Sequence, residues 1–355
     1  MPEWLTKYRL EARLTLRMSA AGLIAFALAQ LLGLARDYWA VLTAVIVMQA
    51  SVGGSLKAMV DRFLGTIGGA AWGAVVTSSL PHADALSTGV ALAVALVPLA
   101  GLVALNPTLR VAPVTAVIVL LGASDQQAVF QTALDRVFEI GLGSAVALAV
   151  ALLISPTSAH GMVRLAARDA LAAMAEQLRN LLADISRPPD AAATTDLHDR
   201  IRTAIDRVST AAEEARREQR AYLSVTPDPD PVVRTLRRLH HDLIMVARAV
   251  AAPLPEPVEQ RLVAPVSAAA AVLPDALVGM GDALASAAPP PDTAPAHQAL
   301  TGFSAEFATL RRDGIIRGFP EEEVERIFGL AFALEQLGRH LDELADRVQE
   351  IAASG

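Results

Sequence analysis

The sequence predicts an all-α protein in two parts, a six-helix transmembrane module built as a 3+3 inverted repeat and a cytoplasmic α-helical bundle. Apolar residues make up 53% of the chain, which exceeds the usual share in soluble proteins. Of the 30 basic and 37 acidic residues, twelve lie between Leu16 and Ser155 and fifty follow Ser155. We therefore predict an interfacial N-terminal helix over residues 1–17, a transmembrane domain over 18–156 and a cytoplasmic helical domain over 157–355.

An internal repeat predicts the inverted architecture. The pentapeptide Thr43–Val47 recurs as Thr115–Val119, and the pair Asp61-Arg62 recurs as Asp135-Arg136, at offsets of 72 and 74 residues. Each repeat contains three predicted spans, so the second repeat crosses the membrane in the opposite orientation. Inverted repeats of this kind occur in secondary transporters, which bind substrate between the repeats near the middle of the membrane.

The N-terminal segment 3–17 interleaves Trp4 and Tyr8 with basic residues, a pattern typical of a helix at a membrane surface. Apolar runs follow that are long enough to cross most of a bilayer. We predict spans at 18–35, 38–55, 63–80, 85–105, 111–128 and 137–155. Nine Lys and Arg residues then fall on the side of the N-terminus and two on the other, which predicts cytoplasmic N- and C-termini.

Glycines mark one face of the third span. Gly65, Gly69 and Gly73 recur every four residues and therefore share one side of a helix. Gly143 takes the position of Gly69 in the second repeat. Because small residues at this spacing let two membrane helices approach closely, we predict all four as helix-packing positions.

The second and fifth spans are interrupted, over Gln49–Ser55 and, beyond Pro113, over residues 122–127. Interrupted spans at corresponding positions of two repeats indicate a substrate site. The candidate substrate-binding residues of these spans are Thr43, Thr115, Gln49 and Ser51. The alternative for the two threonines is a hydrogen bond to the backbone of their own helix.

Two arginines are further candidates for substrate binding. Arg62 and Arg136 are predicted to begin the third and sixth helices at opposite membrane faces, where they would draw an organic anion into a shared cavity. The alternative is that Asp61 and Asp135 cap these helices while the arginines reach toward lipid headgroups. Glu139 is the candidate for proton coupling, and its alternative role is a static ion pair with Arg136.

The second half shows the spacing of amphipathic helices, separated by proline-rich turns. We predict helices near 159–186, 194–222, 230–251, 257–287, 294–312 and 320–353. The last has apolar residues at a spacing of three and four, the seam of a helix bundle or a coiled coil, suited to dimerisation. Segment 262–288 is apolar, but Asp275 and Asp282 favour a buried helix of the bundle over a seventh span.

Several function classes lack support in the sequence. The chain has no cysteine, and its net charge of −7 gives no basic surface for nucleic acid. Because adjacent residues on a helix point apart, His240-His241 is not a convincing metal site. Tyr38, Trp39 and Trp72 are interpreted as interfacial or packing aromatics. Without a nucleotide-binding or hydrolase motif, we predict a protein that is not an enzyme and needs no cofactor or metal.

Two motifs carry a family resemblance that covers roughly residues 15–157. Tyr38-Trp39-Ala, followed by Arg62-Phe-Leu-Gly65-Thr66 and Gly69, resembles the signature of the FUSC family, the fusaric acid resistance and aromatic acid exporter proteins of bacterial inner membranes. The usual Gln-Pro-Ser of that family stands here as Gln49-Ala50-Ser51. One membrane module followed by a helical domain is also similar to the layout of plant aluminium-activated malate channels, which are dimers.

The resemblance implies a homodimer in the bacterial inner membrane that transports small organic anions, chiefly aromatic carboxylates. With Glu139 as the proton carrier, the leading hypothesis is proton-coupled export across the lipid bilayer. The alternatives are a dimeric anion channel gated by the cytoplasmic helices and a membrane scaffold that transports nothing.

Overall fold

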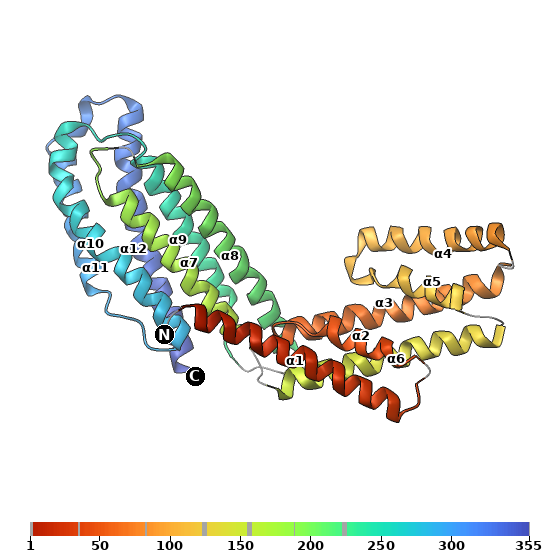
Figure 1. Cartoon of the computed structure of the whole chain (residues 1–355). Helices are drawn as coiled ribbons and strands as arrows, with labels where there is room; N and C mark the ends of the chain where they lie inside the picture. The colour runs from red at the N-terminus through yellow and green to blue at the C-terminus, as the bar shows by residue number, and fades with distance from the viewer. Residues whose placement is uncertain are drawn as a thin grey trace. The chain divides into compact units, whose positions relative to one another are not determined.

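The computed structural model describes residues 3–34, 36–81, 84–122, 126–154, 158–187, 189–221 and 226–354. These residues form α-helices and two short 3-10 helices, with no strand among them, so the predicted all-α class is confirmed. The chain divides into two compact units, Met1–Ser158 and Ala159–Gly355 (Figure 1).

The first unit contains two kinds of helix. Its elements are α1 (Glu3–Leu31), α2 (Tyr38–Val47), α3 (Val52–Ser79), α4 (Ala85–Leu105), η1 (Pro107–Leu109), α5 (Ala112–Gly122) and α6 (Gln126–Leu153). Segments of α1, α4 and α6 are long and apolar enough to cross a membrane, whereas α2 and α5 are short apolar helices. Of the six predicted spans, three therefore have the length and composition of a full crossing.

Helix α1 joins two elements that the sequence suggested were separate. It runs without a break from Glu3 to Leu31, through the predicted junction between residues 17 and 18. Arg17 therefore lies within a helix, on the same face as the fully buried Ala21 and Ala25.

The predicted boundary between the second and third spans is wrong. Helix α2 ends at Val47, and α3 begins at Val52, where the Ser51 hydroxyl accepts a hydrogen bond from the Gly54 amide at 2.8 Å. A serine in this position satisfies an amide that has no partner within the helix. The interruption is thus confined to 48–51, and α3 starts before the predicted position of 63.

The second interruption lies between α5 and α6. Helix α5 ends at Gly122 and α6 begins at Gln126, ahead of the predicted start at 137. Residues 123–125, the centre of this predicted interruption, lie outside the described residues. Both α3 and α6 contain 28 residues. In each helix the arginine, Arg62 or Arg136, lies ten residues after the first residue of the helix.

Small residues bring the helices of the first unit into backbone contact. Helix α3 packs mainly against α5 and α6, and α6 packs mainly against α2 and α3. A Cβ atom built on Gly69 would lie 2.2 Å from the Ala112 carbonyl oxygen, and one on Gly143 would lie 2.3 Å from that of Ala40. Gly73 similarly approaches the backbone of α5. Any side chain at these positions would push the paired helices apart.

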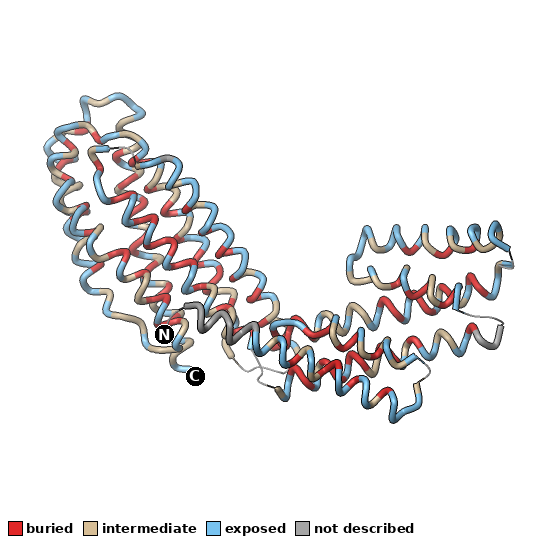
Figure 2. Tube along the Cα trace, viewed as in Figure 1, coloured by how far each residue is buried: buried red, intermediate tan, exposed pale blue. Residues whose placement is uncertain are grey.

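The described residues of the second unit form six long helices and one short one. They are α7 (Ala159–Leu182), α8 (Ala191–Arg220), α9 (Asp230–Ala249), α10 (Glu256–Ser286), α11 (Ala294–Arg312), η2 (Ile315–Gly318) and α12 (Glu321–Ala353). The six predicted helices of this half match them to within four residues at each end. Buried faces turned toward the centre of the unit alternate with exposed outer faces (Figure 2).

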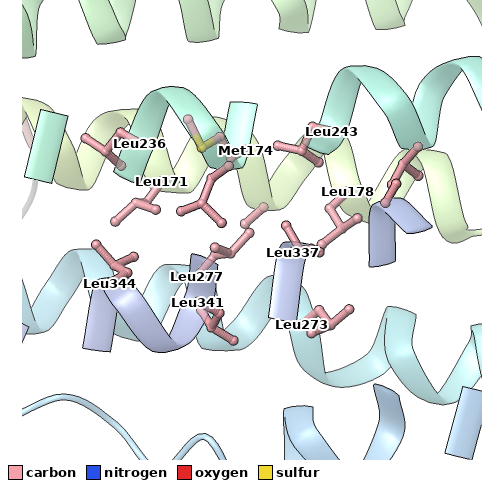
Figure 3. Close-up of a cluster of buried hydrophobic side chains, with 14 of the residues drawn as sticks. Leu171, Met174, Leu178, Leu236, Leu243, Leu273, Leu277, Leu337, Leu341 and Leu344 are labelled. Atoms are coloured by element: carbon pink, nitrogen blue, oxygen red, sulfur yellow. The ribbon is translucent and has the colours of Figure 1, made fainter. Parts of the chain in front are cut away.

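The apolar seam of α12 is buried in the core of this unit. Leu171 and Leu178 of α7, Leu236 of α9, Leu277 of α10 and Leu341 of α12 gather in one buried cluster (Figure 3). The seam suggested for dimerisation is therefore largely buried inside a single chain. Its function is intramolecular packing.

Helix α10 is apolar and long enough to cross a membrane, yet its apolar face lies in the core of the second unit. Its two aspartates pair with arginines of α7. Asp275 lies 3.2 Å from Arg179, and Asp282 lies 2.7 Å from Arg168. These contacts support the prediction of a buried bundle helix.

The adjacent histidines of α9 have different surroundings. His240 Nε2 lies 3.2 Å from His198 Nδ1 on α8, whereas His241 is exposed. Burial, with a smaller contribution from His198, lowers the pKa of His240 to about 4. The imidazole of His240 is consequently neutral near physiological pH.

Candidate functional site

Two arginines from different halves of the first unit meet the short helix α2. Arg62 of α3 donates from Nε to the Thr43 hydroxyl at 3.1 Å. Arg136 of α6 lies with its Cζ atom 4.3 Å from the centre of the Trp39 ring. Trp39 and Thr43 are four residues apart and therefore occupy adjacent turns on one side of α2. The two arginines thus converge on a single helix.

This arrangement corrects the predicted position of both arginines. Neither begins a helix, since α3 starts at Val52 and α6 at Gln126. They also do not face opposite surfaces of a bilayer about 30 Å thick, because their contacts lie one helical turn apart. Asp61 is not a helix cap and instead pairs with Lys57 at 2.8 Å.

Arg136 and Glu139 form a buried ion pair. Arg136 Nη1 lies 3.3 Å from Glu139 Oε2, and both side chains are 1% exposed. The contact is close enough for electrostatic attraction but does not have the geometry of a hydrogen bond. No described group makes a well-formed hydrogen bond to either oxygen of Glu139, although the Arg36 backbone amide lies nearby. A buried pair with such unsatisfied atoms is poorly stabilised.

Gly143 of α6 lets the helix that carries this pair pack closely against α2. Gly143 lies one turn beyond Glu139, and a Cβ atom there would be 2.8 Å from that of Thr43. Thr43 thus lies at the contact of three helices, with Arg62 of α3 bonded to its hydroxyl. The hydroxyl therefore contacts a charged side chain, in addition to any bond to its own helix, which was the alternative considered for it.

The other candidates make local contacts. Thr115 donates to the carbonyl of Val111, the residue just before its own helix, at 3.2 Å, which agrees with the local bond considered as its alternative. Ser51 caps α3, and the exposed Gln49 donates from its side chain to the Ile46 carbonyl at 3.1 Å. A part for these three residues in substrate binding stays a prediction.

The sequence interpretation missed two residues. Trp39 was assigned to packing or to the membrane interface, but its ring contacts a cation; its position one turn before Thr43 was the available signal. Arg17 was assigned to an interfacial helix but is 1% exposed. The small residues Ala21, Ala25 and Ala29, which continue its face of α1, indicated that this face is packed.

Comparison with known proteins identifies the chain. Residues 24–150 match the family described as fusaric acid resistance protein-like. Proteins named "Putative arylamide transporter" from Mycobacterium bovis and Mycobacterium tuberculosis are 30% identical to it over 261 residues, which cover 69% of this chain and 69% of each relative. The chain belongs to the FUSC family. Its family and its apolar helices make the protein a membrane transporter. The matched segment includes α2 and the two arginines that contact it, Arg62 and Arg136.

Proposed function

We propose that this FUSC protein exports small organic anions, chiefly aromatic carboxylates, across the bacterial inner membrane together with protons. One observation carries the proposal: Arg62 and Arg136 converge on adjacent turns of α2, at Thr43 and Trp39. A guanidinium group recognises a carboxylate through two parallel hydrogen bonds. The indole ring offers a flat surface for an aromatic substrate.

Proton coupling follows from the pairing of Arg136 with Glu139. A substrate carboxylate that binds Arg136 must compete with the Glu139 carboxylate 3.3 Å away. In a medium of low dielectric constant two carboxylates at one cation repel strongly, so substrate binding would favour protonation of Glu139. Release of substrate would favour loss of that proton. Anion and proton would therefore bind together and leave together.

We further propose that the first unit is a 3+3 inverted repeat with cytoplasmic termini, followed by a cytoplasmic helical domain. The packing supports this assignment, because Gly69 of the first repeat meets Ala112 of the second while Gly143 of the second meets Ala40 of the first. Each position differs from its counterpart by 74 or 72 residues, the offsets of the sequence repeat. The homodimer implied by the resemblance stays a prediction and would need a surface other than the buried seam of α12.

The name shared by the relatives points to a second substrate class. An arylamide has the aromatic ring but no anionic carboxylate, and the Trp39 ring would accept it equally well. The two classes differ in their need for the arginines. A neutral amide gains little from a guanidinium pair, whereas a carboxylate depends on it.

Uptake into proteoliposomes distinguishes these possibilities. Labelled terephthalate and its neutral diamide would be compared with and without an imposed pH gradient, and protein-free liposomes would correct for diffusion. We expect terephthalate, but not the diamide, to accumulate above equilibrium only when the gradient is present, and E139Q to lose this accumulation. Accumulation of the diamide alone would refute the anion proposal. Flux that follows membrane voltage without a pH gradient would indicate a channel, and no flux would favour a scaffold.

A further inference from the structure

Arg17 is a buried cation apart from the two arginines on α2. It lies in α1, and its side chain is 1% exposed. Nη1 donates to the carbonyl oxygen of Ala50 at 3.1 Å, whereas Nε and Nη2 are buried and have no hydrogen-bond partner among the described residues. Most of the hydrogen-bonding capacity of this guanidinium is therefore unused.

No carboxylate lies within ion-pair distance of Arg17 among the side chains that the structure describes. Its neighbourhood is apolar, since Ala21, Val47 and Met48 belong to the buried cluster formed by this part of the unit. A buried charge without a counter-ion is strongly destabilising, and proteins normally pair such groups. The surroundings of Arg17 thus call for an anion that the described residues do not supply.

The guanidinium lies at the interruption between α2 and α3. Ala50, which accepts its hydrogen bond, immediately precedes Ser51, the N-terminal cap of α3. The first turn of that 28-residue helix is built from small buried residues, among them Gly53 and Gly54. The positive end of a long helix dipole therefore lies beside a buried guanidinium. Both features favour bound negative charge.

We propose that Arg17 and the α2–α3 interruption form a second anion-binding site, which accepts a carboxylate or phosphate group. This site uses neither Arg62 nor Arg136, and its occupancy does not depend on the direction or coupling of transport. Its anion neutralises Arg17 and links α1 to the start of α3. Two sources supply this chemistry: a soluble organic or inorganic oxyanion, and the phosphate of an anionic lipid.

Thermal unfolding of the full-length protein tests the site. Tryptophan fluorescence reports on this unit, because Trp4, Trp39 and Trp72 all precede residue 158. Wild type, R17Q, R17K and R13Q would be titrated with benzoate and with inorganic phosphate in neutral detergent, and reconstituted separately into nanodiscs with or without phosphatidylglycerol. Arg13 is the matched control, since it lies one turn earlier on the same helix but is exposed.

We expect inorganic phosphate to raise the unfolding temperature of wild type, R13Q and R17K but not of R17Q. Benzoate, which can also bind at Arg62 and Arg136, should raise the unfolding temperature of R17Q less than that of wild type. The apparent Kd of R17Q should be at least tenfold weaker, equivalent to about 1.4 kcal/mol. A response to benzoate or phosphate would identify a soluble anion as the ligand, and a response to phosphatidylglycerol alone would identify a lipid. If R17Q does not fold, R17K decides: an anion affinity close to that of wild type supports the site, and loss of the response contradicts it.

Two outcomes would overturn the proposal. The first is an equal anion response in wild type and R17Q, and the second is the absence of any response in wild type with all three anions. Neither depends on transport, so failure of the proposed export would appear separately in the flux measurements. An R62Q/R136Q variant that loses transport should keep the response assigned to Arg17.

Discussion

Substitution of Gly69 by alanine tests the helix contact that holds α3 against α5. The added Cβ would lie 2.2 Å from the Ala112 carbonyl oxygen and 2.8 Å from its Cα, whereas ordinary contact begins near 3.4 Å. Because the clash is with backbone, a rotamer change cannot relieve it, and α5 must move by about 1 Å. Overpacking of this kind costs about 1–3 kcal/mol.

Gly68 provides a matched control on the same helix. A Cβ atom there meets nothing within 4 Å, so G68A gains the helix propensity of alanine, about 1 kcal/mol, without a clash. G69A gains the same propensity. The difference between the two variants therefore isolates the overpacking term.

The assay is thermal unfolding in detergent followed by tryptophan fluorescence. A difference of about 1–3 kcal/mol corresponds to an unfolding temperature roughly 2–12 °C lower for G69A than for G68A. Equal unfolding temperatures, or a more stable G69A, would refute the close packing of α3 on α5. The reasoning about Gly143 and α2 would then lose its support as well.

Three further predictions concern single side chains. R136Q should destabilise the protein by about 3–5 kcal/mol, and R136Q/E139Q by less, because the double variant leaves no uncompensated buried charge; a thermal double-mutant cycle measures the coupling. T43V, which removes the hydroxyl bonded to Arg62, should raise the KM for a transported anion about fivefold, corresponding to about 1 kcal/mol, in a flux assay. The pKa of His240 is about 4 in the folded chain and about 6.5 when unfolded, so the unfolded chain binds the proton first as pH falls. The titration of His240 therefore leaves the free energy of unfolding unchanged above pH 6.5 and lowers it progressively as pH falls to 4. H240N should therefore weaken the acid dependence of stability, measured by circular dichroism, by up to about 3 kcal/mol, whereas H241N should not.

The helices of the second unit were predictable because each has recognisable start and stop signals in its own sequence. The last begins after Pro320 with three glutamates in its first turn, and the turn over 289–292 separates its two predecessors. Such local features act through backbone geometry and the helix dipole. The helices that pack against the α12 seam could not be predicted, because the same spacing suits packing against a partner chain or against a neighbouring helix of the same chain.

The membrane half was less predictable where charge and helix geometry conflict. Lys57, Asp61 and Arg62 resembled a membrane edge, but they lie inside α3, because Ser51 starts the helix earlier and their side chains pair with neighbours. The meeting of Arg62 with Thr43 depends on how α3 crosses α2, which no local signal encodes. Burial of Arg17 likewise depends on packing against other helices.

The most direct test of the account is the initial rate of labelled terephthalate flux in proteoliposomes of wild type, R62Q, R136Q and R110Q. Arg110 is the control, because it is an exposed arginine of the same unit. If the two arginines on α2 bind the transported anion, R62Q and R136Q should each lower kcat/KM by at least tenfold, while R110Q stays within twofold of wild type. Wild-type rates in both R62Q and R136Q would contradict the assignment of the site to α2.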